Sequence, residues 1–362
     1  MNDFQNWSAT IGHREYLVDD CEVQRAVVRL KEKGVRSSSF LIRISFGLAA
    51  LLHGGSVLAE GLQLNLPVRC RLGESCFVQN YMDRDASTAA RDYQCSFRTY
   101  DGHSGTDFRL PSMKEEREGV DVLAAAPGVV TAVRDGVEDV YYNRASPESN
   151  GRECGNGVVI SHDGDWSTQY CHLKKGSLRV SRGERVQAGQ AIGQVGLSGM
   201  TEFPHLHLTV RQGSRVVDPF SPGESGCGMH DPLWSKAFLD GYQYLAGTVI
   251  NSGFADGPVD ARAIEDGKSG SAPTVSSPML IAYFRWMGLD KGDQLHIVLR
   301  APDGSVLAEA APAPLEKSRA LELRYIGRKR PNEGWSKGTY AAESWVSREG
   351  KTILQKSISI TF

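Results

Sequence analysis

The chain shows no excess of charge of one sign. Its 362 residues include 41 lysines and arginines and 43 aspartates and glutamates, and the formal net charge is −2 at pH 7. Proteins that bind nucleic acid through its phosphates present a basic face, and this sequence contains no long basic run. The composition therefore gives no reason to expect a nucleic acid as a partner.

Long hydrophobic runs are missing as well. The main apolar segment near the N-terminus, residues 46–52, is too short to span a bilayer comfortably. Basic residues precede it, and the small residues Val57 and Ala59 stand three positions and one position before Glu60, a layout typical of a cleaved secretory signal peptide. We therefore expect a periplasmic or secreted chain without an integral membrane span after cleavage. An uncleaved N-terminal anchor is the alternative.

The polar stretch ahead of this apolar segment is unusual for a signal peptide. We expect that roughly the first thirty residues are not translated in the natural protein, with Val35 encoded by a GTG start codon. The N-terminal extension and the signal peptide together would then occupy residues 1–59. Peptides that begin at Met1, detected by mass spectrometry of the cellular protein, would contradict this expectation.

The chain has few cysteines, seven in all, and Cys21 lies upstream of the expected cleavage. The exported chain would keep six, and an even number in an exported protein predicts disulfides in an oxidising compartment. This favours the periplasm of a Gram-negative bacterium. Among the possible pairings we favour Cys70–Cys76, Cys154–Cys171 and, by elimination, Cys95–Cys227.

Residues 60 to about 100 show no long helical period, and the 39 glycines of the full chain indicate frequent turns. Short alternating or β-branched runs separated by turns predict an all-β protein. We expect an N-terminal segment (60–100), a small antiparallel β domain (101–225), a connection (226–243) and an Ig-like β-sandwich (244–362). The sandwich is predicted from about seven short runs, and the Ser/Gly/Pro-rich residues 266–278 are interpreted as a loop inside it.

The strongest local pattern lies at residues 205–210. His205, His207 and Thr209 alternate with two leucines and a valine, which predicts a strand with the polar residues on one face and the aliphatic residues in a core. Two imidazoles held side by side on a strand suit metal binding, acid–base chemistry or both. The alternative is a pair of polar residues on a solvated strand face.

Two further motifs carry metal-binding or acid–base side chains. His103 and Asp107 stand four residues apart in a glycine-containing stretch, and His172 ends a predicted strand. Donors from His103, Asp107 and one central histidine would form a three-ligand Zn²⁺ site with an open fourth position, as a catalytic zinc requires. No His-Glu-x-x-His helix is present, so the remaining histidines would have to transfer the protons.

Taken in order, these motifs support a resemblance. His-x-x-x-Asp, Tyr-x-His-Leu, Ser-Gly and Pro-His-Leu-His, spread over residues 102–220, resemble the lysostaphin/LytM-type zinc metallopeptidase family. The resemblance implies a small antiparallel β fold (a duplicated hybrid motif) with the site in a groove, and the peptide part of bacterial peptidoglycan as substrate. Matched by motif, the implied zinc ligands are His103, Asp107 and His207, and the implied catalytic pair is His172 and His205.

The sequence departs from the family pattern in two places. Leu208-Thr209 follows the last histidine, where the family often has Phe-Glu, and we expect this change to affect the groove wall rather than a ligand. A polar insertion between residues 136 and 155 is expected to be exposed and to reshape one side of the groove. Cys171, next to His172, is expected to form a disulfide and not to act as a nucleophile, because neighbours on a strand face opposite ways.

Three functions remain open at this level. The first is a zinc endopeptidase that cuts peptidoglycan stem peptides or cross-links, the second a non-catalytic LytM-like regulator of cell-wall amidases, and the third a secreted zinc protease acting on other proteins. Retention of all five site residues favours the first. The C-terminal sandwich could bind cell wall or a protein partner, or shield the groove, and its residues do not distinguish these roles. His162 is expected to be structural, and His230 and His296 are expected to be surface or packing residues.

Overall fold

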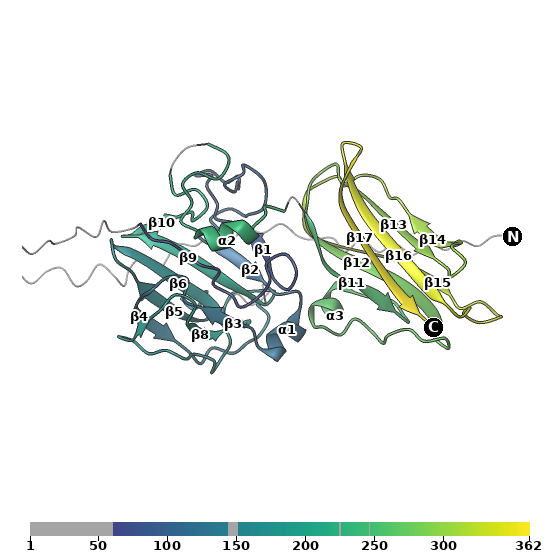
Figure 1. Ribbon diagram of the computed structural model, residues 1–362, viewed down its shortest axis with the longest axis horizontal. Helices are drawn as coiled ribbons and strands as arrows, with labels where there is room; N and C mark the ends of the chain where they lie inside the picture. Colours follow the sequence, from purple (N-terminus) through teal and green to yellow (C-terminus); the bar gives the residue numbers. More distant parts are fainter. Residues whose placement is uncertain (1–60, 144–150, 224–225, 246) are drawn as a thin grey trace, which may run out of the picture.

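The computed structural model describes residues 61–143, 151–223, 226–245 and 247–362 (Figure 1). The expected signal peptide lies outside these residues. Seventeen strands and three short helices occur in the described part of the chain, which confirms the all-β prediction. Within the same residues, no helix has the length and apolar character needed to cross a membrane.

The first unit is built on an eight-stranded antiparallel sheet. Seven of its strands follow one another in the order β1 (Phe77–Asn80), β2 (Thr106–Arg109), β9 (His205–Gln212), β6 (Trp166–Leu173), β5 (Asn156–Ser161), β4 (Gly128–Arg134) and β7 (Arg185–Val186). The eighth, β10 (Arg215–Val217), pairs with β9. The other elements of this unit are the two-stranded sheet of β3 (Asp121–Leu123) and β8 (Ala191–Gln194) and the helices α1 (Met113–Glu118) and α2 (Lys236–Gly241).

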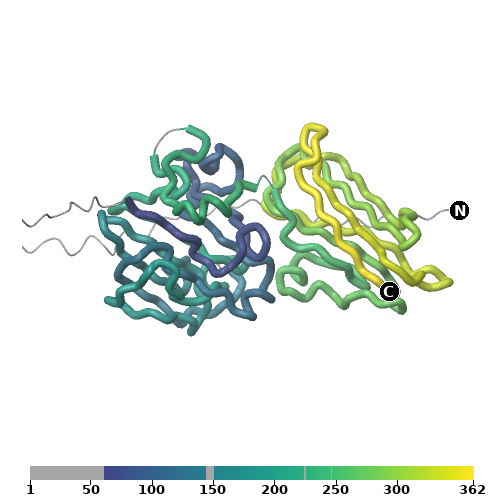
Figure 2. The backbone as a smooth tube through the Cα atoms, in the orientation of Figure 1, coloured from purple at the N-terminus to yellow at the C-terminus, as the bar shows by residue number. Residues whose placement is uncertain are grey.

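The core of this unit follows from the alternation of β9. Leu206, Leu208 and Val210 are at most 1 % exposed, because successive side chains of a strand point to opposite faces. The same core includes residues of the expected N-terminal segment, such as Leu64, and of the expected connection, such as Trp234. Figure 2 shows the purple N-terminal segment running along this unit. The domain boundaries stay predictions, but these two segments are packed parts of the first unit.

The C-terminal unit is a seven-stranded sandwich, drawn in light green and yellow in Figure 2. One sheet has the order β11 (Thr248–Ala255), β12 (Met279–Leu289) and β15 (Arg319–Lys329), and the other has the order β14 (Val306–Ala310), β13 (Gln294–Arg300), β16 (Thr339–Arg348) and β17 (Lys351–Thr361). Phe284 and Trp286 of the first sheet share a core with Leu295 and Ile297 of the second. The Ig-like topology stays a prediction.

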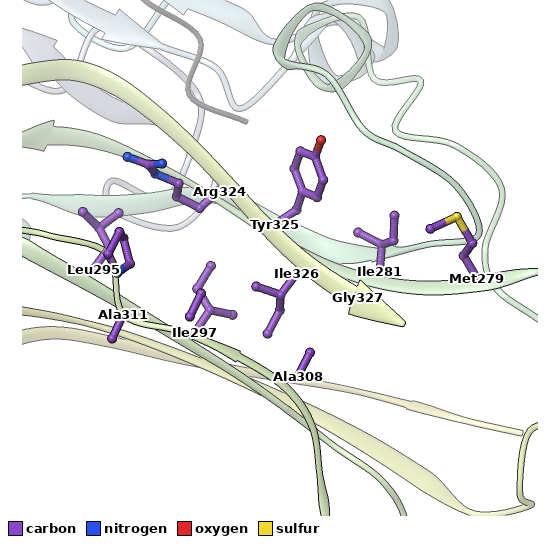
Figure 3. A pocket seen from close by; sticks show the side chains of 12 residues that line it. Met279, Ile281, Leu295, Ile297, Ala308, Ala311, Arg324, Tyr325, Ile326 and Gly327 are labelled. Carbon is purple, nitrogen blue, oxygen red and sulfur yellow. The ribbon is translucent and has the colours of Figure 1, made fainter. Parts of the chain in front are cut away.

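The connection between β11 and β12 contains a helix that the sequence analysis did not foresee, α3 (Ala261–Glu265), capped by the Asp260 side chain. Residues 266–278 follow it as an irregular loop within the sandwich, as predicted. Between the two sheets lies a largely apolar cavity of about 260 Å³, lined by Ile281 and Ile326 from one sheet and Ile297 from the other (Figure 3).

All three predicted disulfides form: Cys70–Cys76, Cys95–Cys227 and Cys154–Cys171. Cys95–Cys227 joins positions 132 residues apart and ties the N-terminal segment to the chain that leads into α2. Cross-links over long loops restrict the unfolded chain most, so this disulfide is the one expected to add most to stability.

Candidate active site

The three expected metal ligands lie together. Asp107 of β2 and His207 of β9 are directly paired in the antiparallel register, and His103 lies in the loop before β2. Asp107 Oδ1 is 3.2 Å from His103 Nε2 and 2.9 Å from His207 Nδ1, and the two nitrogens are 3.2 Å apart. Gly105 allows this approach, since a Cβ there would lie 2.6 Å from His207 Nε2.

Hydrogen bonds on the far side of each ring fix which nitrogen faces the cluster. His103 Nδ1 lies 2.6 Å from the carbonyl oxygen of Tyr81, which can only accept, so the proton is on Nδ1 and Nε2 keeps its lone pair. The hydroxyl of Thr209 lies 3.0 Å from His207 Nε2 and can accept its proton, which leaves Nδ1 available. Such outer partners set the tautomer of metal-binding histidines.

The protonation states of Asp107 and His207 are those required for binding a metal ion. Burial would raise the pKa of Asp107, but the neighbouring His103 and His205 hold it well below its ordinary value. Burial also lowers the pKa of His207, despite the opposing effect of Asp107. An ionised carboxylate and a neutral imidazole are the forms that bind metals.

The donor set therefore fits a small divalent cation. Three acceptor atoms converge at mutual distances of 2.9–3.2 Å. Donors bonded at about 2.0–2.1 Å to a tetrahedral ion would lie about 3.3 Å apart. Within the described residues, His103, Asp107 and His207 are the group found with metal-binding geometry.

Asn80 is a site residue that the sequence analysis missed. It pairs with Asp107 in the β1–β2 register, and its Nδ2 donates to Asp107 Oδ2 at 2.8 Å. This bond engages one carboxylate oxygen and leaves Oδ1 to the histidines. No local motif marks Asn80, because its partner is 27 residues away on a neighbouring strand.

We expect Asn80→Ala to weaken metal binding by about 10- to 100-fold, the usual effect of losing an outer partner of a ligand. The carboxylate of Asp107 would be free to rotate, so its geometry toward the cation would be less well fixed. Competition with a chelator of known affinity measures the change, and Asn65→Ala, which alters an asparagine outside the cluster, is the control. Unchanged affinity in Asn80→Ala would show that the bond is dispensable.

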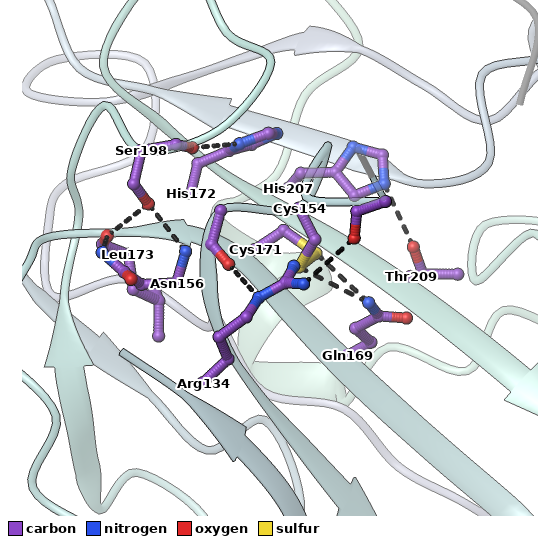
Figure 4. The surroundings of a disulfide bond; sticks show 12 residues. Arg134, Cys154, Asn156, Gln169, Cys171, His172, Leu173, Ser198, His207 and Thr209 are labelled. Atoms are coloured by element: carbon purple, nitrogen blue, oxygen red, sulfur yellow. Dashed lines mark hydrogen bonds between the residues drawn. A yellow bond between two sulfur atoms is a disulfide. The ribbon is translucent and has the colours of Figure 1, made fainter. Parts of the chain in front are cut away.

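His172 occupies an unusual backbone conformation at the end of β6. Its φ is 62°, in the left-handed region that costs a non-glycine residue about 1–2 kcal/mol. The backbone N–H donates to Cys154 O at 2.8 Å, and ring Nδ1 donates to Ser198 O at 2.8 Å (Figure 4). Burial, reinforced by His205 and His207, lowers the pKa of His172 well below its ordinary value. The ring is therefore neutral, with an unprotonated Nε2.

The ring of His205, at the start of β9, is oriented like that of His172, by a hydrogen bond from Nδ1 to a backbone carbonyl. Its Nδ1 donates to Phe203 O at 2.9 Å, with Thr201 Oγ1 at 3.1 Å. The rings of His172 and His205 are 4.6 Å apart between centroids, and His205 Nε2 lies 3.5 Å from Asp107 Oδ1. The expected catalytic pair thus stands next to the three expected ligands.

Cys171 is bonded to Cys154 beside these residues, as Figure 4 shows. It pairs with His207 in the β6–β9 register and directly precedes His172. The disulfide removes the thiol as a nucleophile, as expected, and holds together the two segments that meet at His172.

One sequence expectation needs correction. Thr209 does not form a groove wall: it is 2 % exposed and contacts the ring of His207, while Leu208 lies in the core. Strand pairing covers Thr209, and the sequence pattern alone does not show that cover. The described residues of the insertion, 136–143 and 151–154, are exposed or half-buried, as expected, and Asp139 among them accepts hydrogen bonds from Leu197 N and Lys175 N.

The other histidines in the described residues lie apart from this cluster. His162 donates to Pro127 O at 2.7 Å, the exposed His230 contacts a backbone carbonyl, and His296 stacks on Trp345 at 4.8 Å between centroids. These contacts agree with the roles expected from the sequence.

Comparison with known proteins finds a family match within the first unit. Residues 101–219 match the model of Peptidase family M23. Over 116 residues the chain is 35% identical to the peptidoglycan DD-endopeptidase ShyA of Vibrio cholerae, covering 32% of this chain and 22% of that protein. Over 119 residues it is 32% identical to the DD-carboxypeptidase/endopeptidase Mpg of Neisseria meningitidis, covering 33% and 22%. The chain thus spans about a fifth of the length of these relatives.

Solved structures give a weaker likeness. The catalytic domain of the prophage-encoded M23 protein EnpA from Enterococcus faecalis is 24% identical, with 40% of this chain and 88% of that chain covered and a TM-score of 0.28. A zinc containing peptidase from Vibrio cholerae is 27% identical, with 39% of each chain covered and a TM-score of 0.26. TM-scores this low add nothing about the fold. The family match confirms the resemblance carried by the motifs: the chain contains a Peptidase family M23 domain in residues 101–219.

Proposed function

We propose that the chain is a zinc-dependent endopeptidase that hydrolyses peptide bonds in the stem peptides or cross-links of peptidoglycan. The observation that carries this proposal is the convergence of His103 Nε2, Asp107 Oδ1 and His207 Nδ1 beside the imidazoles of His172 and His205. The family match supports the reaction, and so do the two relatives, a peptidoglycan DD-endopeptidase and a DD-carboxypeptidase/endopeptidase; the first of them also supports the substrate class.

His103, Asp107 and His207 would hold the zinc ion. Two nitrogens and one carboxylate oxygen form a donor set that zinc accepts, and three protein ligands leave a fourth position open, as catalytic sites require. Zinc in this position supplies a Lewis acid that polarises the scissile carbonyl and activates water near neutral pH. The pairing of Asp107 with His207 across β2 and β9, and the burial of His103 and Asp107, hold the three ligands in place.

His172 and His205 would transfer the protons. Each ring commits its Nδ1–H to a backbone carbonyl, so Nε2 is the atom that can accept a proton. The same carbonyls stabilise the imidazolium that results, because they accept from its Nδ1–H. A neutral imidazole can take a proton from the attacking water, and an imidazolium can stabilise the developing oxyanion or protonate the leaving amine.

The proposed location is the periplasm or the exterior of a bacterium. Peptidoglycan lies outside the cytoplasm, and the three disulfides of the described chain form in oxidising compartments. In this proposal residues 101–225 form the catalytic domain and residues 244–362 the accessory sandwich.

The direct test is release of soluble peptides from purified peptidoglycan. We expect release by the zinc-loaded full chain, loss of release after dialysis against a chelator, and recovery after zinc is added back. Circular dichroism of the dialysed protein controls for unfolding.

Two outcomes would contradict the proposal. Cleavage of casein without release from peptidoglycan would indicate a protease for other proteins. A folded, zinc-loaded chain that cleaves neither substrate would indicate a non-catalytic regulator.

A further inference from the structure

One loop, residues 196–204, supplies the partners of both expected catalytic histidines. Ser198 O accepts from His172 Nδ1, and Phe203 O accepts from His205 Nδ1. The Phe203 ring also stacks on His205, with centroids 4.4 Å apart. The position of loop 196–204 therefore sets the direction of both Nε2 atoms.

The first contact route to this loop starts in the C-terminal sandwich. Glu265, the last residue of α3, accepts from Arg109 Nη2 through both carboxylate oxygens at 2.7 Å. Arg109 is fully buried on β2, where it is paired with His205 in the strand register. Its guanidinium lies over the Phe203 ring, 4.6 Å from the centroid. Glu265 thus contacts the residue that packs on the loop.

Removing a single charge at this contact would cost free energy of folding. Arg285 of β12 also pairs with Glu265, and all three side chains are at most 5 % exposed. Burial would raise the pKa of Glu265, but Arg109 and Arg285 outweigh it and hold the pKa below its ordinary value. Removing the carboxylate charge would leave two buried guanidinium groups without their shared partner, which is strongly unfavourable.

Apolar side chains of the two units also pack against each other around this contact. Phe77 of β1 forms one buried cluster with Ile250 of β11 and Met287 of β12. Asn251 Nδ2 donates to Pro111 O at 3.2 Å across the same junction. The sandwich is therefore seated directly on the β1–β2 side of the sheet that carries the site.

A second route starts at the next residue, Asp266. Its Oδ1 accepts from Tyr141 Oη at 2.6 Å, and the guanidinium of Arg262 lies 3.2 Å from the centroid of the same ring. The neighbouring Tyr142 donates its N–H to Thr201 O, within loop 196–204, at 2.9 Å. The insertion thus links the end of α3 to the loop independently of Arg109.

We propose that α3 of the C-terminal sandwich positions His172 and His205 through loop 196–204, with Glu265 as the principal positioning residue. The sandwich is then part of the architecture of the active site and not only an attached binding module. This proposal rests on the catalytic roles given to the two histidines under the proposed function. It assigns Glu265 no contact with the substrate.

The test compares Glu265→Gln with Glu322→Gln in the full, zinc-loaded chain. Glu322 is a matched control: it is equally buried, and its arginine partners, Arg319 and Arg324, belong to its own strand and not to the first unit. We expect Glu265→Gln to lower kcat about 10- to 100-fold with little change in KM, since small misplacements of catalytic groups have effects of this size. Zinc content should stay at the wild-type level, and Glu322→Gln should keep the wild-type kcat.

A second readout does not depend on activity. Nitrogen-15 NMR of the histidine side chains reports the tautomer and hydrogen bonding of each ring, and we expect the signals of His172 and His205 to shift in Glu265→Gln but not in Glu322→Gln. Wild-type signals in Glu265→Gln would overturn the proposal even if the chain proved inactive on peptidoglycan. If the wild-type chain proved inactive on peptidoglycan and Glu265→Gln still shifted the two signals, the positioning role would stand and the proposed reaction would be refuted.

A milder variant covers the case in which Glu265→Gln does not fold. Tyr141→Phe removes only the hydrogen bond to Asp266 on the second route. We expect it to fold and to shift the His172 and His205 signals in the same direction by a smaller amount. A folded Tyr141→Phe protein with unchanged imidazole signals would overturn the second route and, together with an unfolded Glu265→Gln protein, the proposal.

Discussion

His207→Ala is expected to abolish metal binding and peptide release together. The substitution removes one of three donor atoms that lie 2.9–3.2 Å from one another. Two donors cannot hold a cation in the same geometry. The loss of metal affinity should therefore exceed the 10- to 100-fold loss that is typical when an outer partner of a ligand is removed. We expect release from peptidoglycan to fall more than about 100-fold. Metal content after gel filtration, measured by mass spectrometry, checks the first part.

The fold should tolerate this change. The opposite face of β9 keeps Leu206 and Leu208 in the core, and the space near Gly105 becomes less crowded. His230→Ala is the matched control, because His230 is exposed and lies outside the cluster. A His207→Ala protein that retained one equivalent of zinc would refute the assignment of this ligand.

His172→Ala is expected to give the opposite combination: retained zinc and lost activity. His172 is not among the three converging donors, yet its neutral ring stands 4.6 Å from that of His205. Loss of a positioned proton-transfer group lowers rates by about 100- to 10,000-fold. Release of peptides from peptidoglycan and zinc content, measured on the same preparation, check both parts.

Alanine at position 172 also carries a backbone cost, because φ there is 62°. His172→Gly removes the ring while accepting this conformation, and we expect it to be at least as stable as His172→Ala and equally inactive. Thermal unfolding of the two variants separates backbone strain from chemistry. More than a tenth of wild-type activity in a zinc-loaded His172→Gly protein would show that His172 does not transfer the proton.

Much of the fold and most of the site could be predicted from local patterns in the amino-acid sequence. The alternation at residues 205–210 predicted a strand with its leucines buried, because a period of two leaves one face to the core. The spacing of His103 and Asp107 and the order of the later motifs indicated the family that the comparison found. The cysteine pairs were predicted correctly, and the C-terminal unit, predicted from about seven short runs, has seven strands.

Other parts of the site depend on contacts between residues far apart in the sequence. Asn80 meets Asp107 through strand pairing, and Thr209 turns toward His207 on a covered face, so neither role has a local signature. Glu265 is 156 residues from Arg109, and a single glutamate on a five-residue helix gives no sign of that partner. Local patterns record which face of an element is buried. They do not record which distant side chain covers it, because that depends on how the completed sheets pack.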